Sequence, residues 1–316
     1  DANGTPILAR NLCRNDDTID DRVLALRVED AETAAVRAVL LSYAVMPVVL
    51  RRRHMAFGRD LPGMLEDALA AALPGDPTVL FVNGATGDVS PRSGDAAAHV
   101  ERFVRRVEDD LLAGPAHERI RVVAAAAERD LGAPRTFHAL GDRRAFRDRV
   151  LASRFGDDAP SVLANLVALP VNVGLWSLGL PEARFGFTFD GAVGLGLGLE
   201  DVVGRDASRA GAVLLEVPGE AGPAARALLL WQAGIPTQGA GRAWRSRMEA
   251  RGLPTPLVLA LTNGSLGYLV APDEYDGPCR YEALSTLYGP DSARLVLELL
   301  EGAVDGLGAD PGSRPR

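Results

Sequence analysis

Strand-like and helix-like segments alternate along nearly the whole chain, and this alternation limits the folds that it can adopt. Apolar runs or apolar–polar alternation predict strands at residues 23–28, 38–49, 78–82, 119–127, 163–173, 212–217 and 257–261. Helical spacing predicts helices at residues 63–73, 95–112, 143–153, 224–232, 243–251 and 292–304. Helices that alternate with strands pack on a sheet in layers. We therefore predict an α/β fold, a layered mixed sheet with flanking helices in a single catalytic-type domain.

Composition and charge exclude two classes of protein. Hydrophobic residues make up 47% of the 316 residues, enough for a sizeable core, while the net charge of −8 argues against binding to nucleic-acid phosphates. The longest apolar stretch, residues 162–180, is interrupted by Asn165, Pro170, Asn172 and Gly174, so it fits buried strands better than a bilayer span. We expect a domain at residues 1–305 and a disordered tail at 306–316.

The two cysteines leave the redox compartment open. Cys13 and Cys279 are too few for a disulfide scaffold and lack the CxxC spacing of a zinc site. A single bridge between them would fit an exported chain, but the sequence does not show whether they are close in space.

Residues 83–92 (NGATGDVSPR) form a glycine-rich loop directly after a predicted buried strand. In α/β folds, ligands gather at the carboxyl ends of strands, and glycines let the backbone approach a ligand closely. Asn83, Gly87 and Asp88 are therefore candidates for substrate binding. A plain turn explains the same composition equally well.

Two further segments carry candidate site residues. Residues 217–220 (VPGE) place the carboxylate of Glu220 in a tight turn after a strand, although a solvated turn residue is the simpler interpretation. Residues 263–290 hold four of the five tyrosines in the chain: Tyr268, Tyr275, Tyr281 and Tyr288. Packing of buried phenols is the alternative explanation for this cluster.

Taken in order, these segments resemble the neutral/alkaline non-lysosomal ceramidase family across roughly residues 10–304. The shared motifs are GDVSP at residues 87–91, PGE at 218–220, and NGxxGY, EY, RYE and STLYGP within 263–290. The resemblance implies a zinc amidohydrolase that cleaves the N-acyl bond of ceramide or a related lipid amide.

The resemblance also implies roles for particular residues. Glu220 and Tyr268 are the implied zinc ligands, Ser90 is an implied catalytic residue, and Tyr281 is expected to contact the scissile amide or its oxyanion. A catalytic arginine is expected within residues 10–14. These roles require Glu220 and Tyr268 to converge on one pocket beside the GDVSP loop. The family is commonly exported or membrane-facing, which suggests a secreted or extracytoplasmic location.

The sequence departs from the family at the zinc histidines. The segment that should carry one of them reads YAVMP at residues 43–47, so Met46 occupies the histidine position. Zinc sites are built from imidazole, thiolate and carboxylate rather than thioether. The other histidine lies in a family segment upstream of Asp1, and His54 would serve only as a shifted ligand. We expect a degenerate or N-terminally truncated member with weak or no ceramidase activity.

The sequence leaves three functions open. The first is a hydrolase with an altered metal site, and the second is a catalytically inactive module that binds a lipid amide. In the third, the motifs only hold loops in place. Metal binding distinguishes the first from the second, and substitutions at Ser90 and Tyr281 test the third.

Overall fold

A computed structural model describes residues 9–13, 19–50, 58–91, 96–131, 207–220, 223–275, 279, 282–283 and 286–308. The predicted elements at residues 143–153 and 163–173 lie outside these ranges, as does the glycine-rich segment 190–206.

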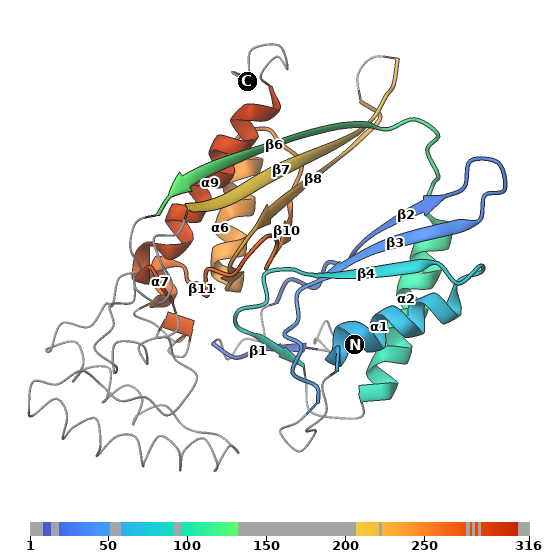
Figure 1. Cartoon of the computed structure of the whole chain (residues 1–316), viewed down its shortest axis with the longest axis horizontal. Coiled ribbons are helices and arrows are strands. Elements are labelled where there is room, and N and C mark those ends of the chain that lie inside the picture. The colour runs from blue at the N-terminus through green and yellow to red at the C-terminus, as the bar shows by residue number, and fades with distance from the viewer. Residues whose placement is uncertain are drawn as a thin grey trace, which may run out of the picture.

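The N-terminal part of the fold is a three-stranded mixed sheet covered by two helices. β3 (Val36–Tyr43) pairs antiparallel with β2 (Leu24–Glu29) and parallel with β4 (Thr78–Asn83). Apolar side chains that alternate along β3, such as Val39 and Leu41, are buried on one face of the sheet. α1 (Asp60–Ala72) and α2 (Ala96–Ala113) pack on each other and complete this core (Figure 1).

The C-terminal part is built on a second, four-stranded sheet in the order β10-β8-β7-β6. Its strands are β6 (Arg121–Asp130), β7 (Ala207–Val217), β8 (Ala225–Gln232) and β10 (Leu257–Leu259). α9 (Ser292–Leu307) lies along β6 and β7, as Figure 1 shows. α6 (Gln238–Glu249) buries Trp244, whose indole Nε1 donates a 3.1 Å hydrogen bond to the carbonyl of Ala293.

The prediction of a helix at residues 224–232 was wrong, because this segment is strand β8. Its run of Ala, Arg and Leu has high helix propensity. In the fold it pairs with β7 on one side and β10 on the other, and Leu228 and Leu230 are fully buried. Burial between two strands thus outweighs local propensity.

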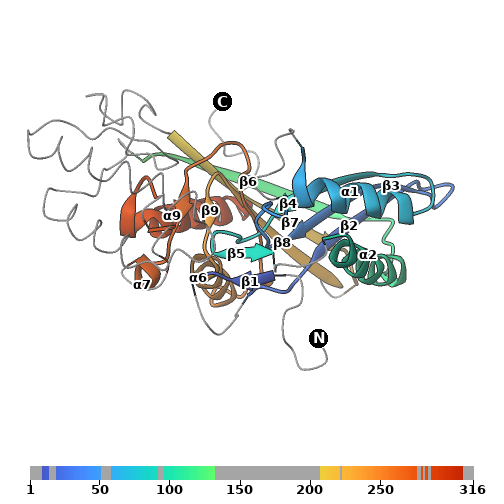
Figure 2. The same cartoon turned by 90° about the horizontal axis from the view of Figure 1, so that it is seen from below.

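Each part also contains a short two-stranded ladder near the junction of the two parts. β1 (Ala9–Asn11) pairs with β5 (Val89–Pro91), and β9 (Ile235–Pro236) pairs with β11 (Tyr268–Leu269). β1 and β5 lie between α6 and the two N-terminal helices (Figure 2). The end of β4 also meets the end of β10, where Ala260 N donates a 2.7 Å hydrogen bond to Asn83 O. The 3₁₀ turn η3 (Gly289–Asp291) and the short helix α7 (Pro272–Tyr275) complete the described elements.

The arrangement confirms the predicted fold class of mixed sheets with flanking helices. The remaining predicted strands and helices within the described ranges are present, although β3 ends at Tyr43 and α6 begins at Gln238. α9 continues to Leu307, slightly past the predicted domain limit at residue 305. No helix in the described ranges combines the length and apolar character that crossing a bilayer requires.

Candidate functional site

The GDVSP loop is pressed against the chain segment that leads into α6. Gly87 N donates a 2.8 Å hydrogen bond to Pro236 O. A Cβ atom at residue 87 would lie 3.0 Å from both Pro236 O and Thr237 N, closer than side-chain carbons normally approach backbone. Glycine at this position therefore permits contact between the loop and β9.

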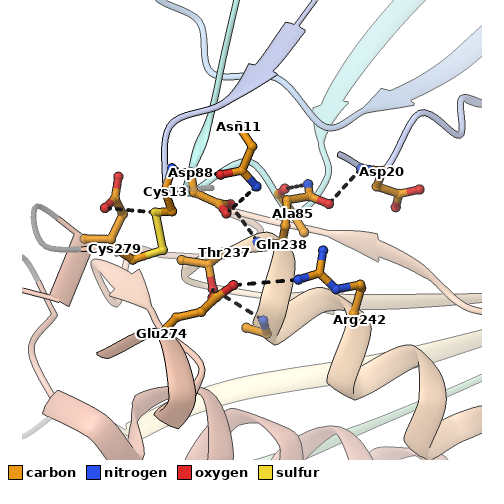
Figure 3. A network of polar contacts seen from close by, with 12 residues as sticks. Asn11, Cys13, Asp20, Ala85, Asp88, Thr237, Gln238, Arg242, Glu274 and Cys279 are labelled. Atoms are coloured by element: carbon orange, nitrogen blue, oxygen red, sulfur yellow. Dashed lines mark hydrogen bonds and ion pairs between the residues drawn. A yellow bond between two sulfur atoms is a disulfide. The ribbon is translucent and has the colours of Figure 1, made fainter. Parts of the chain in front are cut away.

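Asp88 anchors a buried polar network where these segments meet. Its side chain is fully buried, Oδ1 accepts a 2.6 Å hydrogen bond from Gln238 N, and Oδ2 accepts a 3.0 Å bond from Asn11 Nδ2. The Gln238 side chain extends the network, since its Nε2 donates to Ala85 O and its Oε1 accepts from Asp20 N (Figure 3). Burial raises the pKa of Asp88 to about 6, against the lowering effect of the Gln238 hydrogen bond.

Thr237 connects the start of α6 to a second buried carboxylate. As the N-cap of α6, its Oγ1 accepts a 3.3 Å hydrogen bond from Ala240 N. The same hydroxyl donates a 2.6 Å bond to Glu274 Oε2, and Arg242 Nη2 lies 3.8 Å from Glu274 Oε1 (Figure 3). Glu274 is only 1% exposed, so these contacts replace the hydration that its carboxylate would have in solvent.

A disulfide closes the network on its other side. Cys13 and Cys279 are bonded, and their Cα atoms are 4.7 Å apart (Figure 3). Glu282 Oε2 lies 3.4 Å from Cys13 Sγ, and burial raises the pKa of Glu282 to about 7. Sequence reasoning left this bridge open. Disulfides persist in oxidising compartments, so the bridge is consistent with an extracytoplasmic location.

Tyr268 lies beside this cluster. In β11 it is paired with Ile235 of β9, and it packs against the small apolar cluster of Cys13, Val270 and Cys279. Tyr268 therefore lies beside the disulfide that adjoins Asp88 of the GDVSP loop, while its predicted role as a zinc ligand stays a prediction. Ile235, the strand partner of Tyr268, is an apolar residue.

The predicted convergence of Glu220 with Tyr268 was wrong. Glu220 is exposed in the turn that connects β7 to β8, next to the start of β8 at Ala225. Tyr268 pairs with Ile235, which follows the opposite end of β8. An eight-residue strand separates the two sites, which corresponds to roughly 20 Å or more at about 3.3 Å per residue. A three-residue PGE match cannot distinguish a hairpin turn from a ligand-bearing turn.

The other candidate residues are distributed around the loop. Met46 N donates to Val89 O at 3.0 Å, and Thr86 Oγ1 lies 3.5 Å from Met46 Sδ, so the residue at the predicted histidine position does contact the GDVSP loop. Ser90 is partly buried and pairs with Arg10 across β1 and β5. The predicted roles of Ser90 and Arg10 stay predictions.

The three residues predicted to bind substrate lie at the end of β4 and in the loop that follows it. Asn83 is the last residue of β4, and its buried Oδ1 has no hydrogen-bond partner among the described residues. Gly87 and Asp88 are buried, and their contacts are with the protein itself. Tyr281 and His54 lie outside the described residues.

The residues on which the implied zinc site depends do not fit a zinc ion. Glu220 is at the far end of β8, and Met46 offers a thioether where the family pattern has imidazole. Within the described ranges, the one group of three or more His, Cys, Asp and Glu ligand atoms close enough to hold a metal is Cys13, Asp88 and Cys279. Its two sulfurs are bonded to each other in this structure.

Solved structures of known proteins decide the fold relationship. Neutral ceramidase from Pseudomonas aeruginosa superimposes with a TM-score of 0.57 and 14% identity, covering 97% of this chain and 52% of that chain. The chain shares the fold of neutral ceramidase. A ceramidase complexed with C2 gives a TM-score of 0.53 at 14% identity and covers 92% of this chain and 50% of that one.

The likeness to ceramidases has defined limits. The chain spans about half the length of these two ceramidases. No family model and no curated protein matches the sequence. The resemblance to ceramidases predicted from the motifs is confirmed at the level of the fold, at an identity where fold and chemistry often diverge.

Sequence reasoning missed most of the polar network. Thr237 and Gln238 escaped notice because the predicted helix began at residue 243, whereas a threonine before a helical segment is an N-cap signal. Glu274 and Glu282 lie inside the EY and RYE motifs, whose tyrosines were the predicted site residues. The burial of these two carboxylates could not be read from the local sequence.

Proposed function

We propose that this chain binds the amide-bearing part of a ceramide-like lipid on a ceramidase fold, without hydrolysing it through the implied zinc site. The observation that carries the proposal is the position of Glu220 and Tyr268 at opposite ends of β8. Metal-assisted amide hydrolysis needs about three protein ligands around one ion. Two of the implied ligands are far apart, and methionine stands at residue 46, where the family resemblance implies a zinc histidine.

The retained part of the site supports ligand binding. The GDVSP loop and Tyr268 are held in one region by the Asp88 network and the Cys13–Cys279 bridge. Phenols combine a broad apolar face with a hydroxyl, a combination suited to a lipid amide. One of the similar solved structures is a ceramidase complexed with C2, which supports a lipid-type ligand for this fold.

Hydrolysis remains the second candidate. Ser90 is retained in the loop, and the pKa of about 7 at Glu282 lies in the range useful for general acid–base catalysis. A hydrolase of this kind would have to act without Glu220, so its activity should not depend on that residue.

Two assays on the full chain test the proposal. Equilibrium binding of a fluorescent short-chain ceramide is compared with release of its fatty acid, each after dialysis against a chelator and after zinc addition. We expect saturable binding that is unaffected by zinc, and no release above that of buffer. Zinc-dependent release of fatty acid with turnover would contradict the proposal and support the hydrolase function instead.

Variants locate the binding region. Tyr268→Phe and Ser90→Ala should weaken ceramide binding while thermal unfolding stays close to that of the parent chain. Ser246→Ala is the matched control, because Ser246 is exposed on α6. Equal binding by all three variants would place the ligand elsewhere.

A further inference from the structure

Three potential metal ligands meet beneath the surface at the disulfide, and a fourth carboxylate lies beside them. One ligand atom each from Cys13, Asp88 and Cys279 lies within 4.8 Å of the other two, and all three residues are buried. Glu282 Oε2 lies 3.4 Å from Cys13 Sγ but outside this group of three, so it would have to move toward Asp88 and Cys279 to become a fourth ligand. We propose that reduction of the Cys13–Cys279 disulfide turns this cluster into a binding site for a thiophilic divalent cation of the zinc type. The proposal is independent of lipid binding.

The spacing fits a tetrahedral ion. Zinc binds thiolate sulfur at about 2.3 Å and carboxylate oxygen at about 2.0–2.2 Å, so ligand atoms around it are separated by roughly 3.3–3.8 Å. The distance of 3.4 Å between Glu282 and Cys13 already lies in this range. The two bonded sulfurs are closer than this, and reduction releases them from each other.

The charge of the region also favours a cation. Asp88, Glu274 and Glu282 are 0%, 1% and 4% exposed, so three acidic side chains are buried in this region. Arg242 reaches Glu274, and the structure gives no ion pair to Asp88 or Glu282 among the described residues. A divalent ion bound here would compensate the negative charge of these buried carboxylates.

Existing contacts already position the ligands. Asp88 is held by Gln238 N and Asn11 Nδ2, and Cys13 N donates to Asn11 Oδ1 at 2.8 Å. Such outer contacts orient metal ligands and tune their affinity. Asn11 thus supports two of the proposed ligands at once.

The redox step balances with a dithiol as the reductant. The disulfide takes up two electrons and two protons and becomes two thiols, while the dithiol is oxidised to its own disulfide. Binding of the ion then displaces the two thiol protons. The segments around Cys13 and Cys279 would thus be linked in both states, by the disulfide in the oxidised chain and by the metal ion in the reduced chain.

Cobalt titration of the full chain tests the proposed metal site. Chain reduced with a phosphine and desalted without oxygen should bind one Co²⁺ and show thiolate-to-cobalt charge-transfer bands and tetrahedral ligand-field bands, which added zinc abolishes. The oxidised chain should show neither. Thiolate bands of equal strength in the oxidised chain, or none in the reduced chain, overturn the proposal.

Carboxylate variants separate this site from adventitious thiol binding. Asp88→Asn and Glu282→Gln in the reduced chain should each weaken cobalt binding by at least about 10-fold. Asp110→Asn and Glu101→Gln are matched controls on the exposed face of α2 and should bind like the parent. If Asp88→Asn fails to fold, Glu282→Gln decides the matter, and unchanged affinity in that variant refutes the four-ligand site. Ceramide binding by the oxidised chain is measured separately, so the two proposals fail independently.

Discussion

Asp88 Oδ1 accepts a 2.6 Å hydrogen bond from the backbone N–H of Gln238, the first residue of α6 and 150 positions further along the chain. The carboxylate thus lies at the N-terminus of a helix, where the helix dipole and the unpaired N–H groups favour negative charge. Burial acts in the opposite direction and raises the pKa of Asp88 to about 6. The GDVSP loop is tied to the C-terminal part of the fold by a group whose charge depends on pH.

Stability should therefore fall as the pH rises from about 4 to about 7. Because the folded pKa of Asp88 is raised from 3.8 to about 6, its protonated form contributes stability at low pH, and this contribution is lost as pH rises through the folded value. A pKa difference of this size corresponds to a free-energy difference on the order of 3 kcal/mol. Glu282, whose pKa is raised to about 7, acts in the same direction.

Urea unfolding at pH 5 and pH 8 measures this dependence. The free energy of unfolding of the parent should decrease between the two, and Asp88→Asn should reduce the decrease because its side chain does not titrate. Asp110→Asn, at an exposed site, should keep the parental profile. A parent that is more stable at pH 8 than at pH 5, by a margin that Asp88→Asn preserves, would contradict the expected direction of the pH dependence.

Thr237→Val should destabilise the fold by roughly 1–3 kcal/mol. Valine has a similar shape, but it removes both the N-cap contact to Ala240 N and the hydrogen bond to the buried Glu274 carboxylate. Thr237→Ser keeps the hydroxyl and should stay close to the parent. Thermal and chemical unfolding of the pair provide the measurement, and equal losses in both variants would mean that the methyl group rather than the hydroxyl is responsible.

Gly87→Ala should cost more stability than the same change at Gly302. The added carbon at residue 87 meets backbone atoms of Pro236 and Thr237 at 3.0 Å, and backbone cannot rotate away as a side chain can. At Gly302, inside α9, the nearest atom is Ala127 Cβ at 3.4 Å, an ordinary contact, and alanine favours helix. We expect a loss of about 1–3 kcal/mol for the first and a neutral or stabilising effect for the second. Differential scanning calorimetry of both variants checks the order.

Removing the disulfide should lower stability by about 2–5 kcal/mol. Cys13 and Cys279 are 266 positions apart, so their bond restricts a very long loop in the unfolded chain. A Cys13→Ser, Cys279→Ser double variant in chelator should melt well below the oxidised parent and close to the reduced parent. Indistinguishable melting of the double variant and the oxidised parent would show that the bond contributes nothing to stability.

Local patterns were sufficient for most elements of the fold. The alternation in β2, the apolar run in β4 and the helical spacing of α2 and α9 each reflect how one element buries one face. The prediction for strand β8 was wrong because its residues favour a helix while its position favours a buried strand. The strands that pair with it, β7 and β10, cannot be identified from the local sequence. Local preference is a weak guide in such cases.

Sequence motifs identified individual segments of the candidate site but not the contacts between residues that are distant in the sequence. The GDVSP loop and Tyr268 were singled out from their motifs, and both adjoin the Cys13–Cys279 disulfide in the structure, although their predicted roles stay predictions. The Asp88–Gln238 contact and the Cys13–Cys279 bond join residues too far apart for spacing to reveal. Glu220 was misplaced because proline, glycine and a charged residue are also the ordinary composition of a hairpin turn.

The residues of the N-terminal core fall between positions 9 and 111, whereas Gln238, which binds Asp88, and Cys279, which bonds to Cys13, follow more than a hundred residues later. During synthesis on the ribosome, the sheet of β2, β3 and β4 can thus pack while the GDVSP loop is still in contact with water and Asp88 carries its charge. Arrival of α6 and of the segment around Cys279 then buries that carboxylate. Between about pH 4 and pH 6, burial of Asp88 in this last docking event should take up a proton from the medium. Lowering the pH within this window should therefore accelerate the final stage of folding more than it accelerates the packing of the first core.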